Sequence, residues 1–274
     1  MTVSTPTDLT TDGRQPDFAA DWAAWHAARE ESFRDPHGWV SITALHWLTG
    51  TPTVLDGVPG RWSTHGATVR IQATAADGIA LPDGTVVDGL AELDPVEGAP
   101  GLAVRAGDLL LELARRTGHD IVRVHDPRAP QLAAFAGIPT FEPATRWVVT
   151  GTYVPFDAPR VVTTGAVVEG LEHHHTAVGT VTFRLEGAEH SLVVFDAGGR
   201  GLQVLFRDAT SGVTTYPGAR TLALGPVAAD GTVTVDLNRA ANLPCGLTAF
   251  ATCPVAPPEN VLPVAVEAGE RWAH

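Results

Sequence analysis

From Gly50 onward the chain consists of short apolar runs separated by glycine, proline, aspartate and asparagine, and this pattern constrains the fold more than any other feature. Short runs suit strands better than helices, because a helix needs a longer amphipathic stretch to bury one face. The clearest runs are residues 67–73, 102–105, 109–113, 120–124, 145–154, 180–185, 191–195 and 232–237. Hairpin-type turn signals lie at Asp77-Gly78, Asp83-Gly84 and Asp230-Gly231. The pattern predicts an all-β fold, mainly antiparallel, built as a barrel or a sandwich.

A different periodicity precedes this region and predicts one N-terminal α-helix. Side chains suited to a buried face recur at three- and four-residue spacing, at Phe18, Trp22, Trp25 and Ala28. This spacing indicates an amphipathic helix over residues 18–33. The pair Asp35-Pro36 ends the helix, because the residue before a proline avoids the helical conformation. Residues 1–17 are rich in threonine, aspartate and proline, and we expect them to form a flexible tail.

We expect the rest of the chain, residues 18–274, to form a single β-rich domain. A chain of 274 residues is long for one unit, but all-β domains often reach roughly 200–250 residues. The sequence shows no linker long enough to divide it convincingly. Residues 39–47 suit either a strand or a helical turn, and residues 130–138 suit a short helix in a connection.

The formal net charge of −13 argues against binding partners that are themselves strongly negative. Nucleic-acid backbones and anionic membranes attract clustered positive charge, so we expect neither as a partner. No apolar run is long enough for a transmembrane helix, and the N-terminus lacks the basic start and apolar stretch of a signal peptide. These features predict a cytoplasmic protein whose partner is a small molecule.

A dense polar cluster follows the apolar run at residues 202–206 and is the first candidate site. Arg207 is suited to clamp a carboxylate or a phosphate, and Asp208 is suited to act as a general base or to orient Arg207. Thr210 and Ser211 are possible donors to an anion. The structural alternative is a turn in which the same side chains bond nearby backbone amides and Gly212 supplies a positive φ. Taken alone, the cluster favours the turn.

The second candidate is the irregular, proline-rich stretch from Asp236 to Asn260. Long irregular segments in compact domains are often functional. Here Glu259 and Asn260 follow two prolines that restrict the backbone, and Asn238 and Arg239 stand at the other end of the stretch. The alternative is that the stretch seals one end of the β structure, with Asn238 and Asn260 bonding to exposed backbone.

Cysteine and histidine residues offer further possibilities. Cys245 and Cys253 are compatible with buried thiols, a disulfide, two thiolate ligands or, next to a histidine base, a catalytic thiol. Residues 173–175 are three consecutive histidines, and on a strand only His173 and His175 would share a face. A metal enzyme using this pair with His46 is one hypothesis, but a solvated loop is the favoured interpretation of the histidine run. We expect no cofactor, while a metal stays open.

Several long motifs resemble those of the domain of unknown function 1684 family over about residues 18–272. The first runs from Leu205 to Gly212 and continues through Thr215, Tyr216 and Arg220. The second includes Asn238-Arg239-Ala240, Pro244-Cys245, Ala251-Thr252-Cys253-Pro254 and Pro257-Pro258-Glu259-Asn260. Gly38-Trp39-Val40-Ser41 and Leu45-His46-Trp47-Leu48 resemble the opening motif of the family, and Asp126, Phe135, Gly137 and Arg146 its middle pattern. The resemblance supplies no reaction, but it implies that the two polar stretches form one site.

The chain departs from the family pattern at positions where the family usually carries aromatic residues. These positions hold Ala241, Leu247 and Thr221. The resemblance therefore implies a pocket enlarged by missing rings, suited to a bulkier or different ligand.

Two functions from different classes follow. The first is an enzyme acting on a small polar or anionic metabolite, by hydrolysis or another acid–base step; the second is a small-molecule-binding protein without chemistry that uses the same side chains. The candidate catalytic residues are Arg207, Asp208, Glu259 and Tyr216. The candidate binding residues are Ser41, His46, Thr210, Ser211, Arg220, Asn238, Arg239 and Asn260.

Overall fold

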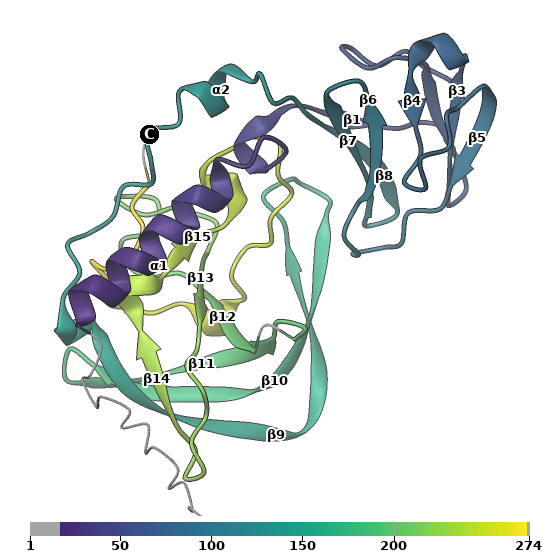
Figure 1. Cartoon of the computed structure of the whole chain (residues 1–274). Helices are drawn as coiled ribbons and strands as arrows, with labels where there is room; N and C mark the ends of the chain where they lie inside the picture. The colour runs from purple at the N-terminus through teal and green to yellow at the C-terminus, as the bar shows by residue number, and fades with distance from the viewer. Residues whose placement is uncertain (1–16, 200, 273–274) are drawn as a thin grey trace, which may run out of the picture.

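The computed structural model describes residues 17–199 and 201–272, which form two lobes joined at one edge (Figure 1). We call residues 42–125 the small lobe, and α1 together with residues 126–272 the large lobe. The predicted tail lies outside the described residues apart from Asp17, whose side chain accepts a hydrogen bond from the N–H of Ala19 and caps the first helix.

The small lobe consists of two antiparallel sheets with a core of their own. Its five-stranded sheet has the order β1-β8-β7-β6-β4, and its three-stranded sheet has the order β2-β3-β5. Apolar side chains from both sheets pack between them, Trp62, Ile71 and Leu111 among them. The strands are β1 (Ile42–Trp47), β2 (Arg61–His65), β3 (Thr68–Ala73), β4 (Ile79–Ala80), β5 (Gly89–Leu93), β6 (Leu102–Ala106), β7 (Leu109–Arg116) and β8 (His119–His125).

The large lobe is built on a seven-stranded antiparallel sheet with the order β14-β9-β10-β11-β12-β13-β15. A separate core covers one face of this sheet and includes Phe183, Phe206 and Leu262. Strands β9 and β10 form a long hairpin that extends beyond the other strands and bends where its register shifts between Ala177 and Gly179 (Figure 1). The strands are β9 (Val148–Gly165), β10 (Glu172–Leu185), β11 (Ala188–Asp196), β12 (Leu202–Phe206), β13 (Arg220–Ala223), β14 (Thr232–Asp236) and β15 (Ala241–Asn242).

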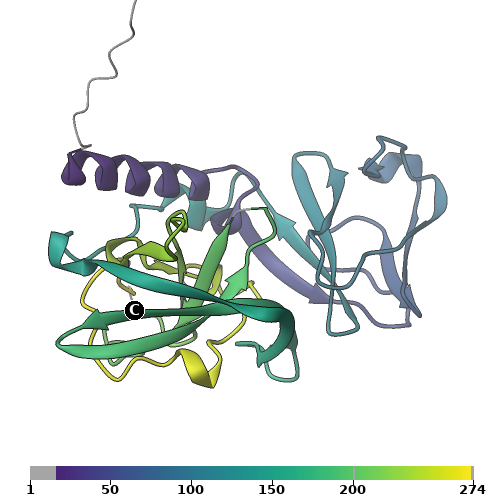
Figure 2. The same ribbon diagram turned by 90° about the horizontal axis from the view of Figure 1, so that it is seen from below.

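Helix α1 (Phe18–Phe33) lies along one side of the large lobe, which Figure 2 shows from below. Phe33 is its one buried residue, and polar contacts hold the rest. The indole N–H of Trp22 donates to the carbonyl of Asn238 at 3.0 Å, and the carboxylate of Glu30 accepts from the backbone N–H of Ile138 at 2.8 Å. The remaining short helices are η1 (Trp39–Ser41), η2 (Ala75–Asp77), α2 (Pro130–Ala133), η3 (Thr145–Trp147), η4 (Leu237–Arg239), η5 (Pro244–Gly246) and η6 (Pro258–Asn260).

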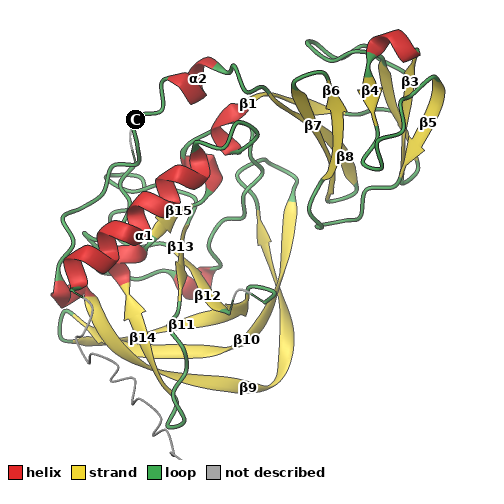
Figure 3. Cartoon of the chain, viewed as in Figure 1, coloured by secondary structure: helices red, strands yellow, loops and turns green. Residues whose placement is uncertain are grey.

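The fold confirms the main sequence predictions. The protein is mostly antiparallel β with one long N-terminal helix, and the helix has the predicted bounds (Figure 3). The three sheets are open over the described residues, so the sandwich alternative fits. Because each lobe has its own core, the assignment of residues 18–274 to one domain stays a prediction. None of the described helices combines the length and apolarity that a membrane crossing needs.

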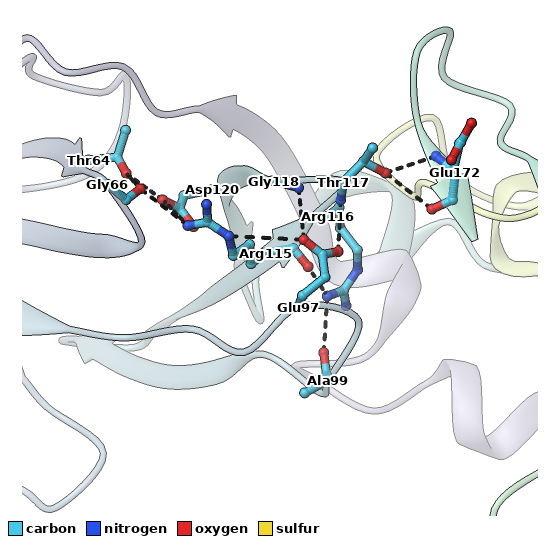
Figure 4. Close-up of polar contacts among 10 residues, drawn as sticks. All are labelled: Thr64, Gly66, Glu97, Ala99, Arg115, Arg116, Thr117, Gly118, Asp120 and Glu172. Carbon is cyan, nitrogen blue, oxygen red and sulfur yellow. Dashed lines mark hydrogen bonds and ion pairs between the residues drawn. The ribbon is translucent and has the colours of Figure 1, made fainter. Parts of the chain in front are cut away.

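Both connections to the small lobe lie at the same edge, because the chain enters through β1 and leaves through the neighbouring strand β8. The lobes also touch at the tip of the β7–β8 hairpin, drawn in Figure 4. There the hydroxyl of Thr117 donates to the carbonyl of Glu172 at 3.1 Å and accepts from its N–H at 2.8 Å. The carboxylate of Glu97 binds the N–H groups of Thr117 and Gly118, which stabilises the positive φ of Thr117.

A second polar contact ties the lobes together through Arg123 on β8. Its guanidinium pairs with both oxygens of Glu112 at 3.0 and 3.1 Å, across the β7–β8 register. The same group donates to the carbonyl of Phe250 and to the hydroxyl of Thr252, each at 3.0 Å. A buried cation thus fastens the C-terminal segment of the large lobe to the small lobe.

Candidate functional site

The two predicted polar stretches do meet in space. The N–H of Arg207 donates to the carbonyl of Asn260 at 2.9 Å, and the N–H of Leu262 donates to the carbonyl of Arg207 at 2.8 Å. Backbone contact brings the stretches together, whereas the side chains of Arg207 and Glu259 are both exposed. The role of this pair in catalysis stays a prediction.

Asp208 and Arg220 form an ion pair inside the large lobe. The guanidinium donates to the carboxylate at 2.6 Å, and both side chains are fully buried. Arg220 also donates to the carbonyls of Val266 and Ala268, and it lies over the ring of Phe206. A fully buried, mutually neutralised pair of this kind holds three segments together. The contacts of Asp208 and Arg220 therefore indicate a structural role for this ion pair.

The polar cluster after Asp208 has the geometry of the turn proposed as the structural alternative. The carboxylate of Asp208 accepts from the N–H and the hydroxyl of Thr210, at 2.7 and 2.6 Å. The N–H of Asp208 donates to the hydroxyl of Ser211 at 3.1 Å, and Gly212 has a φ of 82°. Both hydroxyls therefore form hydrogen bonds within the turn itself.

Asn238 and Asn260 both bond to backbone, as the sealing alternative predicts. The amide of Asn260 bonds to the N–H and the carbonyl of Val193 at 2.7 and 2.9 Å, and to the carbonyl of Leu205 at 2.9 Å. It bridges β11 and β12 where they no longer pair directly. Asn238 forms a similar pair of bonds with the backbone of Ala144. Both side chains are buried.

Ser41, His125 and Glu112 lie in a row that resembles a catalytic triad, but their hydrogen bonds argue otherwise. The hydroxyl of Ser41 is 3.3 Å from Nδ1 of His125, and Nε2 of the same ring is 3.4 Å from Glu112. However, Nδ1 also lies 3.0 Å from the carbonyl of Gly38, which only accepts, so Nδ1 carries a proton and cannot take one from Ser41. Ser41 is fully buried and donates to the same carbonyl at 2.7 Å. The row stabilises the start of β1.

The histidine run is on strand β10, so the prediction of a solvated loop was wrong. The run belongs to the extended part of the β9–β10 hairpin, where it pairs with β9. His173 and His175 share a face with ring centroids 6.2 Å apart, and Nε2 of His173 contacts the carbonyl of Thr252. Burial is the main cause that lowers the pKa of His175, to about 4. Within residues 17–199 and 201–272, no three side chains of His, Cys, Asp or Glu gather as metal ligands, and His46 is on β1 of the small lobe.

A cavity of about 220 Å³ lies between α1 and the sheet of the large lobe. Its floor consists of small side chains on the outer face of the sheet, namely Ala197, Thr221, Ala223 and Ala241. Thr221 and Ala241 are direct cross-strand partners on β13 and β15. These are two of the positions at which the family resemblance implied missing rings, and they leave a shared hollow under the helix.

The walls of the cavity are larger and polar. The wall residues are Trp25 and Arg29 on α1, Gln203 on β12 and Arg239 on η4. Trp25, Ala223 and Arg239 also line an adjoining cavity of about 500 Å³, so the two hollows form one groove beneath the helix. Of the candidate residues from the sequence, Arg239 lies in this groove.

Both arginines of the groove are ion-paired. Arg29 binds the fully buried carboxylate of Glu270 and donates to the carbonyl of Asn242 at 2.8 Å. Arg239 binds Asp236 at 3.1 Å and also Asp21, and its guanidinium lies 5.8 Å from the ring centroid of Trp25. Within the part of the chain that the structure describes, neither Nη1 group forms a hydrogen bond. Each therefore has N–H donors for a ligand, while its charge is already compensated.

Sequence reasoning missed Trp25, Arg29 and Gln203 as groove residues. The four-residue spacing of Trp25 and Arg29 places them on one helix face. The spacing shows only that Arg29 lies beside the apolar face of the helix. It could not predict the ion pair, because the partner Glu270 is far away in the chain.

Comparison with known families identifies the large lobe. Residues 133–271 match the model of the family described as "Protein of unknown function (DUF1684)". The chain belongs to the DUF1684 family. The match covers the motifs at 205–220 and 238–263 and begins after the small lobe, so the DUF1684 segment is the β9–β15 sheet and its C-terminal segment.

One solved structure is similar to part of this chain. The solution NMR structure of an uncharacterized protein of Haloarcula marismortui is similar to this DUF1684 protein at 31% sequence identity. The similarity covers 52% of this chain and 79% of that chain, with a TM-score of 0.43. A search of curated proteins found no significant match.

Proposed function

We propose that this DUF1684 protein binds a small planar molecule in the groove between α1 and the sheet. The observation that carries the proposal is the hollow of about 220 Å³ above Thr221 and Ala241, walled by an indole and two guanidinium groups. A cavity of this size has room for a single-ring molecule, and Trp25 offers an aromatic surface for stacking.

The polar groups of the groove define the ligand further. Nη1 of Arg29 and Nη1 of Arg239 are donors, so the ligand presents acceptor oxygens or nitrogens toward them. Since each guanidinium is already paired with a carboxylate, a neutral acceptor such as an amide carbonyl suffices, and an ammonium group is disfavoured because it offers no acceptor to these N–H groups. Binding without chemistry is preferred over catalysis because Asp208 is neutralised by Arg220 and Glu259 points to solvent.

The test is a thermal-shift titration with three single-ring probes: benzamide, benzoate and benzylamine. Benzamide and benzoate are expected to raise the unfolding midpoint, and benzylamine is not. A ligand at ten times its Kd stabilises the folded state by about 1.4 kcal/mol.

Filling the hollow is the matched genetic test. Ala241→Tyr is expected to place a ring over Thr221 and to abolish the shift by both probes. Ala76→Tyr adds the same ring at an exposed alanine of the small lobe and is expected to leave the shift unchanged. The proposal fails if no probe shifts the midpoint, or if the shift survives in Ala241→Tyr.

A further inference from the structure

Cys245 and Cys253 lie directly against each other, although seven residues separate them in the chain. The backbone N–H of Cys245 donates to the sulfur of Cys253 at 3.3 Å, and the N–H of Cys253 donates to the sulfur of Cys245 at 3.2 Å. Both thiols are free. We call residues 245–253 the cysteine loop.

The two thiols differ in access to solvent. Cys253 is 7% exposed and belongs to the buried residues, whereas Cys245 is half-buried in the short turn η5. A reagent in solution therefore meets Cys245 first. A reachable thiol backed by a buried one is the arrangement that dithiol oxidants and reductants use, because the second thiol then resolves whatever binds to the first.

The surroundings favour negative charge on Cys245. Its pKa lies below the ordinary thiol value, chiefly because the thiol of Cys253 hydrogen-bonds to it. Burial raises this pKa, but the Cys253 N–H, the Tyr216 hydroxyl and the positive charge of Arg123 lower it further. The same hydrogen bond, with burial, raises the pKa of Cys253. Of the two thiols, Cys245 therefore loses its proton more readily, and it is the one on the reachable side.

We propose that Cys245 and Cys253 form a redox-active dithiol that reduces low-molecular-weight disulfides. The Cys245 thiolate attacks one sulfur of the disulfide R–S–S–R, the S–S bond breaks, and the departing thiolate takes a proton from water. Cys253 then loses its proton to solvent and attacks the sulfur of Cys245, which releases the second R–SH. In total, two protein thiols are oxidised to one disulfide, and one external disulfide is reduced to two thiols.

The place of the pair in the fold gives this reaction a structural consequence. The cysteine loop carries the carbonyl of Phe250 and the hydroxyl of Thr252, which are the groups that bind Arg123 of the small lobe. His173 contacts the carbonyl of Thr252 from β10. A disulfide at the base of the loop draws its two ends together directly beside the junction of the lobes.

Wild-type protein provides the first test, because the chain has two cysteines and no others. In a buffer of oxidised and reduced glutathione, we expect the native protein to lose both thiols together and to gain no glutathione mass. Peptide mapping after brief treatment with iodoacetamide is expected to show Cys245 alkylated at least about tenfold faster than Cys253.

Single variants separate the two roles. Cys253→Ser is expected to accumulate a glutathione adduct on Cys245, since nothing resolves it, and Cys245→Ser to remain unmodified. Tyr216→Phe is expected to move the pH profile of Cys245 alkylation to higher pH, whereas Tyr153→Phe, whose hydroxyl donates to the carbonyl of Val178, leaves it unchanged. Circular dichroism confirms that each variant is folded.

The proposal is overturned if native wild type keeps both thiols in oxidised glutathione, or if it gains an adduct on each cysteine without an internal disulfide. Equal alkylation rates of the two thiols in wild type would overturn it as well, and this measurement needs no substitution.

Discussion

At the scale of single residues, the buried polar side chains of the large lobe organise backbone. Asp208 neutralises Arg220, and Asn260 joins β11 to β12 with three hydrogen bonds to backbone groups. Each of these side chains has buried partners in the protein, so its removal leaves an unpaired polar or charged atom in a dry interior. Substituting one of these side chains is therefore expected to lower the free energy of unfolding.

The Asp208–Arg220 pair gives the first prediction. Asp208→Asn removes the charge that compensates a fully buried guanidinium, and breaking such a pair typically costs about 3–5 kcal/mol. The free energy of unfolding from urea titration is therefore expected to fall by that amount. Arg207→Gln and Glu259→Gln, at exposed positions, are expected to change it by no more than about 0.5 kcal/mol. An Asp208→Asn variant as stable as wild type would contradict the structural role.

At the scale of elements, buried charged groups help to attach the outer elements to the sheets. Arg29 anchors α1 to Glu270, and Arg123 anchors β8 to the cysteine loop while pairing with Glu112 on β7. Burial alone raises the pKa of Glu112, but the hydrogen bond from His125 and the positive charge of Arg123 outweigh it and lower the pKa to about 2.

This shift predicts how acid acts on the junction. In the folded protein the pKa of Glu112 lies below the value of 4.5 for a free side chain, so its carboxylate stabilises the fold fully above about pH 4.5, and this contribution is lost as pH falls toward 2. We expect wild type to exceed Glu112→Gln in unfolding free energy by roughly 3 kcal/mol at pH 7, and the difference to shrink below pH 4.5. Chemical denaturation of both proteins over pH 3–7 measures it, and a difference independent of pH would contradict the assignment.

At the scale of the whole molecule, the small lobe is inserted between two adjacent points of the large lobe. The N–H of Asp126, just after β8, donates to the carbonyl of Ser41, just before β1, at 2.9 Å. If two residues alone joined Ser41 to Asp126, this hydrogen bond would be the one that closes a four-residue β-turn. The family match also begins after the small lobe, at residue 133.

Excision of the small lobe tests whether the chain is one folding unit or two. Replacing residues 42–125 with Asn-Gly keeps Ser41 and Asp126 at turn spacing, and the large lobe retains its own core. We expect the shortened chain to unfold cooperatively, at a lower midpoint than the full chain because the contacts of Arg123 are gone. Thermal unfolding by circular dichroism decides the matter, and loss of a cooperative transition would establish residues 18–274 as a single domain.

The sequence alone determined what local chemistry controls. The bounds of α1 follow from side-chain spacing and from Pro36, and most strands follow from apolar runs between turn residues. The turn after Asp208 was already the favoured alternative, because aspartate, threonine and serine bond to nearby backbone in any context.

Tertiary structure alone decided the rest, because it depends on partners far apart in the chain. The histidine run lies on a strand because the β9–β10 hairpin continues past the core. The division into two lobes depends on which sheets pack against each other. Thr221 and Ala241 form a hollow only because β13 pairs with β15 under a helix from the other end of the chain, and Cys245 meets Cys253 only where the loop folds back. The spacing of apolar residues shows on which face of a helix or strand a side chain lies. A binding site also depends on which distant segments of the chain pack against that face, and only the tertiary structure shows this.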